Sequence, residues 1–151
     1  MNKDELKLRL GELVPSAVFE EGSEWTTMII DPAAWGGAAR ELRWGGGLEF
    51  DYLFCVTAVD WKTHVMMVYH LTSTIYRHTL VVKAKLDRDR PVIQTVADIW
   101  RTAEFNEREA YDLMGVEFTG HPDLRRLFMT DDWRGWPLRK DYDDPVNMIK
   151  L

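Results

Sequence analysis

An imidazole and a carboxylate stand two positions apart in the run His121-Pro122-Asp123. Histidine is the side chain that changes its charge most readily near neutral pH, so this pair is a candidate for acid–base chemistry. A simpler interpretation is that His121 orders a turn, because Gly120 and Pro122 beside it are typical turn residues. On the sequence alone we favour the turn.

A second group of charged side chains lies in the run Glu107-Arg108-Glu109, followed by Asp112. Paired carboxylates can perform acid–base work. However, Arg108 and Asp112 are four residues apart, which is the spacing of an ion pair along a helix. Acidic residues also stabilise the first turn of a helix through its dipole. A structural or interface role is therefore the preferred interpretation of this group.

The residues give little support to metal or cofactor chemistry. His64, His70 and His78 match no compact metal-ligand motif, and we expect them to be exposed on strands. Cys55 is the only cysteine, so the chain by itself forms neither an internal disulfide nor a cluster that needs several thiolates. We expect Cys55 to be a small buried hydrophobic residue. The glycines at 45–47 are not followed by Lys-Ser/Thr, so they are not a phosphate loop, and no catalytic, cofactor-binding or metal-ligating residue is predicted.

The elements that must position these residues follow from the spacing of apolar side chains. Asn2 and Glu5 resemble a capping box in front of a helix, and Asp31-Pro32 is a typical helix opening. The patterns predict helices at 3–13 and from 31 to about 44, and strands at 25–30, 48–60, 63–71 and 75–86. In the strand at 48–60 the even positions, from Leu48 to Ala58, are all apolar and are expected to face the core. Alternation with short connections implies an antiparallel meander with one solvated face.

Two short helices are predicted next. Thr95 and Asp98 form a capping signal before an apolar stripe that ends at Ala103, and Asn106 is placed to cap a further helix that stops at Gly115. Residues 1–115 are therefore expected to form one α+β domain, a small and mostly antiparallel sheet with helices packed on one face.

Residues 116–151, which we call the C-terminal arm, show no sustained period of either kind. The arm is too rich in apolar and aromatic side chains to be a solvated tail. Between 116 and 142 five basic residues balance five acidic ones. Trp, Tyr and Arg are the residue types that anchor protein interfaces. The pattern leaves two alternatives open, in which the arm covers its own sheet or the surface of another protein.

Composition narrows the class of protein further. The chain has 151 residues and a net charge of −6, with a pI near 5.2. This length is that of one domain, and the acidic balance argues against a general nucleic-acid or anionic-membrane binder. Neither a signal peptide nor an apolar run long enough to span a bilayer is present. We therefore expect a cytosolic protein or a subunit docked on a larger assembly.

One family closely resembles the second half of the chain. The resemblance rests on Glu107-Arg108-Glu109-Ala110-Tyr111-Asp112-Leu113-Met114-Gly115, then on Gly120-His121-Pro122-Asp123-Leu124-Arg125-Arg126-Leu127, and finally on Asp132-Trp133 with Pro137-Leu138-Arg139-Lys140-Asp141-Tyr142. These residues resemble the C-type or 30-kDa subunit of respiratory complex I, which is the NADH–quinone oxidoreductase. The match is dense over about 98–142 and loose over 1–90.

The resemblance implies a hydrophilic subunit of the peripheral arm of that complex, on the cytoplasmic face of the inner membrane and attached to the membrane only indirectly. Such a protein binds none of the FMN, Fe–S clusters or quinone of the parent complex. It implies a hetero-oligomer in which the chain contacts subunits D, B and I, with its C-terminal segment extended over them. The parent enzyme passes electrons from NADH through FMN and Fe–S clusters to quinone and couples this transfer to proton translocation.

The family signature also implies which residues serve the partner interface rather than catalysis. It maps onto Glu107, Arg108, Glu109, Asp112, His121, Pro122, Asp123, Arg125, Arg126, Asp132, Trp133, Pro137, Leu138, Arg139, Lys140 and Tyr142. Arg125, Arg126 and Arg139 are expected to pair with carboxylates of a neighbour in two-pronged geometry.

Two other hypotheses remain open. Membrane-bound hydrogenases and ferredoxin- or deazaflavin-linked complexes contain similar subunits, so one of those assemblies is an alternative parent for the chain. A less favoured hypothesis is a stand-alone acid–base enzyme that uses His121 with Asp123 or Glu109.

Overall fold

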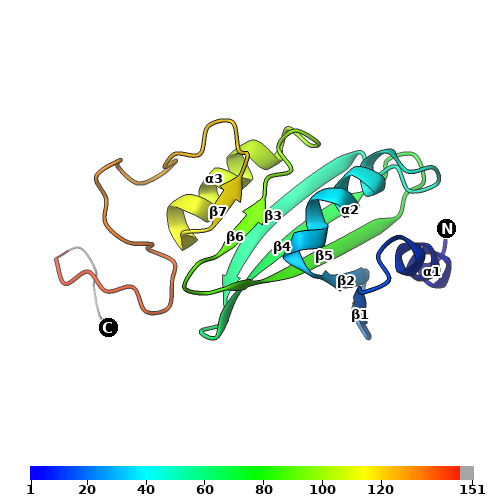
Figure 1. Ribbon diagram of the computed structural model, residues 1–151, viewed down its shortest axis with the longest axis horizontal. Coiled ribbons are helices and arrows are strands. Elements are labelled where there is room, and N and C mark those ends of the chain that lie inside the picture. The colour runs from blue at the N-terminus through cyan, green and yellow to red at the C-terminus, as the bar shows by residue number, and fades with distance from the viewer. Residues whose placement is uncertain (147–151) are drawn as a thin grey trace.

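The computed structural model describes residues 1–146 and shows an α+β fold. The elements in chain order are α1 (Lys3–Leu13), β1 (Val18–Glu20), β2 (Thr26–Ile30), α2 (Pro32–Trp44), β3 (Tyr52–Asp60), β4 (His64–Thr72), β5 (Thr79–Asp87), β6 (Val92–Gln94), α3 (Ala103–Met114) and β7 (Glu117–Thr119). In Figure 1, α2 and α3 lie on the same face of the main sheet, and the C-terminal arm extends beyond α3, at the end of the molecule away from α1.

The main sheet has five strands in the order β1-β2-β5-β4-β3. The meander β3-β4-β5 is antiparallel as predicted. Along β4, buried and half-buried side chains alternate, which is the pattern expected of a strand with one face on the core. The sequence did not predict that β2 would pair with β5 in parallel. The connection through α2 and the two outer strands makes this possible, because a parallel pair needs a long crossover.

The predicted inward face of β3 is wrong over its first half. A β-bulge between Leu53 and Cys55 shifts the register against β4. As a result Leu53 is fully buried, whereas Tyr52 and Phe54 are 48% and 37% exposed. An extra residue in one strand reverses the side of every side chain on one flank of the bulge, and the period of two cannot reveal where this happens.

The helix predicted at 95–103 is absent. Thr95 and Val96 form hydrogen bonds with the Glu107 side chain instead of starting a helix. The segment continues in turns, and it still buries Val96, Trp100 and Ala103 in the core. An apolar stripe therefore marked burial correctly here but not helical structure.

Helix α3 starts earlier than predicted. It begins at Ala103, so Asn106 is inside the helix and its side-chain amide donates to the Thr102 carbonyl. The predicted stop at Gly115 is confirmed, because this glycine adopts the left-handed conformation, with φ of 76°, that ends many helices. Beyond it, β7 pairs in parallel with β6, a small second sheet that the sequence did not predict.

The histidines and the cysteine differ from expectation in their exposure. His78 is buried, and its Nε2–H donates to the Leu48 carbonyl. Burial lowers the pKa of both His78 and the half-buried His70. Cys55 is half-buried rather than buried. In the part of the chain from 1 to 146, no group of three or more His, Cys, Asp and Glu side chains is arranged to hold a metal ion.

Candidate docking site

Helix α3 turns three charged side chains toward the C-terminal arm and buries all of them. Glu107 and Asp112 are 0% exposed and Arg108 is 6% exposed. Buried charges are costly unless hydrogen bonds and opposite charges compensate for the lost water. The partners of these three residues therefore show how the arm is held.

Glu107 connects α3 to the segment after β6. The Thr95 hydroxyl and the Val96 N–H lie 2.5 and 2.8 Å from its carboxylate oxygens. Burial raises the pKa of Glu107 to about 7, although these two hydrogen bonds oppose the rise. His121 Nε2 lies 3.8 Å from Oε2 of Glu107, and both side chains are fully buried.

His121 orders the turn at the start of the arm, as the simpler interpretation proposed. Its Nδ1 accepts a hydrogen bond of 3.0 Å from the Asp123 N–H, and its Nε2 lies 3.0 Å from the Glu104 carbonyl. Because an N–H only donates and a carbonyl only accepts, these partners assign the neutral imidazole with its proton on Nε2. The Asp123 carboxylate binds Arg125 rather than the imidazole. A buried imidazole with both nitrogens engaged offers no access to a substrate, which argues against the stand-alone enzyme.

Arg108 holds the next part of the arm. Its Nε and Nη2 donate to the carbonyls of Arg125 and Arg126 over 3.2 and 2.9 Å, and its guanidinium lies 5.7 Å from the centre of the Phe105 ring. The ion pair predicted between Arg108 and Asp112 along the helix is therefore wrong. Each of these two side chains finds its partners on the arm.

Asp112 binds the backbone of three consecutive arm residues. Its Oδ2 accepts from the N–H groups of Leu127, Phe128 and Met129 over 3.2, 2.6 and 3.0 Å, and its Oδ1 accepts from Arg126 over 3.0 Å. Burial acts to raise the pKa of Asp112, but these donors outweigh burial and keep it below the ordinary value. Asp112 is therefore a buried carboxylate anion that fixes the path of residues 126–129.

Arg126 completes this clasp. Its remaining donors reach the carbonyls of Asp112, Trp133 and Gly135 at 2.9, 2.9 and 3.0 Å. Its guanidinium lies 4.7 Å from the centre of the Trp136 ring. That ring covers Gly115, where an added Cβ would come within 2.7 Å of the indole. The glycine that ends α3 thus also makes room for the arm.

The last part of the arm is bound to the C-terminus of α3 and to the sheet. Arg139 Nε donates to the Met114 carbonyl over 2.7 Å and Nη1 donates to the Arg88 carbonyl over 3.2 Å. The Lys140 N–H donates to Asp60 over 2.9 Å. Asp60 is only 4% exposed and also accepts two hydrogen bonds from Arg88. The Arg88 guanidinium holds the pKa of Asp60 well below its ordinary value.

The arm therefore follows α3 along its length and then reaches the end of β3, so it covers its own domain. Two of the three arginines expected to reach a neighbour's carboxylates, Arg126 and Arg139, form their hydrogen bonds within the chain. The third, Arg125, binds Asp123 and its side chain is 67% exposed. The exposed residues of the predicted interface are Glu109, Pro122, Asp123, Arg125, Asp132, Leu138 and Lys140, and Trp133, Pro137 and Tyr142 are half-buried.

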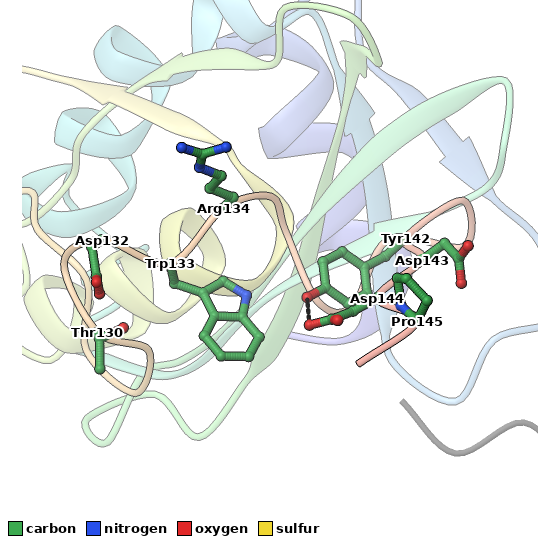
Figure 2. A pocket seen from close by; sticks show the side chains of 8 residues that line it. All are labelled: Thr130, Asp132, Trp133, Arg134, Tyr142, Asp143, Asp144 and Pro145. Atoms are coloured by element: carbon green, nitrogen blue, oxygen red, sulfur yellow. Dashed lines mark hydrogen bonds between the residues drawn. The ribbon is translucent and has the colours of Figure 1, made fainter. Parts of the chain in front are cut away.

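The arm also folds back on itself around an open groove. Figure 2 shows the Trp133 and Tyr142 rings facing the same space, with Asp132 on one side and Asp144 and Pro145 on the other. The groove has a volume of about 410 Å³. The Tyr142 hydroxyl donates to Asp144 over 3.4 Å, and the Tyr142 ring also packs against Gly135. The groove gives the outer side of the arm a shape that contains both aromatic and acidic side chains.

Sequence reasoning missed several residues that hold the arm, among them Thr95, Asp60, Arg88 and Trp136. A signal existed for Asp60, since this acid stands at a core-facing position of its strand, where a lone charge needs a partner. No local signal pointed to the others, because their partners lie far away along the chain.

Comparison with known proteins identifies the family. The family model described as "Respiratory-chain NADH dehydrogenase, 30 Kd subunit" matches residues 28–146. The chain belongs to this family. The predicted membership is therefore confirmed over most of the chain rather than over the dense motif alone.

Individual members of the 30-kDa subunit family agree. The C-type subunit of NADH-quinone oxidoreductase from Moorella thermoacetica is 38% identical over 135 residues, which are 88% of this chain and 90% of that protein. Its counterpart from Chloroherpeton thalassium is 44% identical over 72% of this chain and 46% of its own length. The fused C/D protein of Phocaeicola vulgatus is 48% identical over 70% of this chain and 21% of the fused protein. The match thus spans less than half the length of these last two relatives.

Solved structures share the fold. A trypsin-resistant fragment (1-134) of Nqo5 matches with a TM-score of 0.70 and 24% identity over 82% of this chain and all of the fragment. A chain of the membrane-bound sulfane sulfur reductase, an archaeal respiratory membrane complex, matches with a TM-score of 0.78 and 28% identity, over 93% of this chain and 85% of that one. The predicted α+β class is confirmed by the first of these.

Membrane attachment has no support from the helices themselves. Within residues 1–146, none of the helices combines the length and the apolar character required to cross a bilayer.

Proposed function

We propose that this protein is a structural subunit of the peripheral arm of a complex I-type NADH–quinone oxidoreductase, on the cytoplasmic face of the membrane. In this role it contacts subunits D, B and I and binds no redox group itself. The parent complex passes electrons from NADH through FMN and Fe–S clusters to quinone and couples the transfer to proton translocation.

The observation that carries the proposal is the construction of the arm. Buried charges on α3 fix its backbone from Arg125 to Met129, and yet the arm leaves large apolar side chains in solvent. Phe128 and Leu138 are 62% and 61% exposed. Phe105, beside the arm on α3, is 59% exposed. A rigid segment that displays aromatic side chains is typical of a protein interface.

The chain's own residues do not fit a redox cofactor. Fe–S clusters are held by several thiolates, and this sequence has one cysteine. Dinucleotide and phosphate loops need glycine patterns that it also lacks. Its contribution to electron transfer is then to hold the cofactor-bearing subunits at fixed positions, which is the part that proteins supply in cofactor chemistry.

Fused relatives support the D-type subunit as a partner. In the C/D proteins the homologous region and the D-type region belong to one polypeptide, so the two must lie within reach of each other. Subunits B and I are proposed from the family resemblance, because the two neighbour the quinone-binding region together with the D-type protein.

A second candidate function is the equivalent subunit of another membrane-bound respiratory complex. The 28% identity and TM-score of 0.78 to a chain of the archaeal sulfane sulfur reductase favour it. The two candidates differ in the proteins that surround the chain. Flavin-binding and quinone-reducing subunits are expected for complex I, whereas a metal-bearing large subunit of another type is expected for the alternative.

Purification of the tagged chain from its own cells, with identification of bound proteins by mass spectrometry, tests the proposal. We expect subunits of types D, B and I in fixed ratio with the chain. Arg125→Glu reverses an exposed charge and should lower their recovery without unfolding the chain, because the Arg125 side chain donates hydrogen bonds only to neighbouring Asp123 among the described residues. Recovery of the chain alone, as a monomer, would refute the proposal.

A further inference from the structure

The loop at 125–129 is held by its backbone while its central aromatic side chain points away. The carbonyls of Arg125 and Arg126 accept from the buried Arg108 guanidinium. The three N–H groups that follow donate to the buried Asp112 carboxylate. Phe128 is nevertheless 62% exposed. Two buried charges thus fix five backbone groups of a surface loop whose phenyl ring contributes little to the core.

This arrangement is unusual for a loop whose only role is to cover its own domain. Folding stability would favour the opposite choice, with the phenyl ring buried and the charges in water. What the arrangement provides is a fixed position for the ring. Binding costs less free energy when the contact residue is already ordered, and aromatic anchors on rigid backbone carry most of the energy of many interfaces.

The charges around Phe128 indicate the chemistry of the surface it would contact. Asp131 and Asp132, just beyond the loop, are exposed. Arg125 is paired with Asp123 and also interacts with Asp131. Three acids against one base leave an acidic surround, so a complementary partner has an apolar pocket rimmed by Lys or Arg.

We propose that Phe128 is the anchor of the docking surface and inserts into an apolar pocket with a cationic rim on the D-type subunit. This inference rests on the proposed function and deepens it. The D-type protein is chosen because the fused relatives keep it on the same polypeptide as this region. Asp112 and Arg108 are positioning residues, since they act on the partner only by fixing the loop.

The test uses the whole assembly, purified through a tagged copy of this chain in cells that lack the native one. Phe128→Ala is compared with wild type and with Ile75→Ala, a matched control that is 64% exposed in the β4–β5 turn, at the end of the sheet away from the arm (Figure 1). We expect Phe128→Ala to lower recovery of the D-type protein by roughly tenfold or more, as removal of an interface anchor does. Ile75→Ala should leave recovery unchanged.

The outcomes separate the two proposals. If wild type recovers the D-type protein and Phe128→Ala recovers as much, this inference fails and the proposed function stands. If wild type recovers no partner, both fail. Folding is checked on the isolated Phe128→Ala chain, whose urea midpoint is expected to equal that of wild type because the ring lies mostly in solvent.

Two further measurements test the partner and its chemistry. A photoreactive benzoylphenylalanine in place of Phe128 should crosslink to the D-type protein in the assembly, whereas the same group in place of Ile75 should not. A crosslink only to a different protein of the assembly would overturn the choice of partner. Neutralising Asp131→Asn and Asp132→Asn together should reduce the salt dependence of recovery, and an unchanged dependence would overturn the cationic rim.

Discussion

Replacement of Glu107 by glutamine tests whether a buried, protonated carboxyl group joins α3 to the rest of the domain. The amide is close to the shape of the neutral acid. Its oxygen can accept from the Val96 N–H, and its NH₂ can donate to the Thr95 hydroxyl, so both hydrogen bonds are retained. The substitution therefore removes the titration of Glu107 and little else.

The sign and size of the effect follow from the pKa of Glu107. Burial raises it from 4.5 to about 7 in the folded protein. The folded form holds the proton more tightly than the unfolded form, so this stabilisation is complete below pH 4.5 and is lost as the pH rises to 7. The two pKa values differ by roughly 2.5, which at ~1.36 kcal/mol for each pH unit makes the loss about 3 kcal/mol.

Glu107→Gln keeps the neutral state at every pH, so it should match wild type near pH 4.5 and exceed it by about 3 kcal/mol at pH 8. For a chain of this length the gain corresponds to a rise in Tm of roughly 6–12 °C. Urea unfolding followed by tryptophan fluorescence at pH 4.5 to 8 measures the difference. Glu109→Gln is the control, because Glu109 is exposed on the same helix, and its curve should run parallel to that of wild type. Parallel curves for Glu107→Gln, or lower stability at pH 8, would refute the reasoning.

Three further substitutions test how the arm is held. Asp112→Ala leaves the Arg126 guanidinium buried without its counter-ion and should cost about 3–5 kcal/mol by urea unfolding; trypsin should then cleave the arm in the folded protein, and a wild-type digestion pattern would contradict this. Gly115→Ala must adopt positive φ and displace Trp136, at a cost of roughly 1–3 kcal/mol by the same assay, whereas Gly37→Ala, in open space within α2, should stabilise by about 0.5–1 kcal/mol. Because the pKa of Asp60 is lowered in the fold, its contribution is present above pH 3.8 and is lost as the pH falls, so the stability gap between wild type and Asp60→Asn should narrow in acid-unfolding curves below pH 4 and remain at pH 7.

Local patterns predicted those parts of the fold that depend on local physics. The capping box of Asn2 and Glu5 is present at α1, and Asp31 caps α2 through the Ala33 N–H. The strands β3, β4 and β5 were visible because one face of each meets the core. Gly115 ended α3 as expected because glycine adopts positive φ without steric cost.

Contacts between distant residues decided the rest. The Thr95 segment could have formed a helix, but a carboxylate twelve residues away binds its hydroxyl and the next N–H. The short strands β6 and β7 have three residues each, too few for any period to show, and each exists because the other supplies its hydrogen bonds. A bulge in β3 reversed Tyr52 and Phe54 for the same reason, since register is set by the neighbouring strand.

For the candidate site, the sequence by itself determined the family, the absence of a multi-cysteine centre, and the set of residues that matter along α3 and the arm. Only the tertiary structure decided what each of them does. Arg126 and Arg139 point inward to carbonyls and to Asp112, while Arg125 and Phe128 face solvent. The physical reason is that residue type fixes which bonds a side chain can make, whereas the fold fixes which partner is within reach and how much water remains around it.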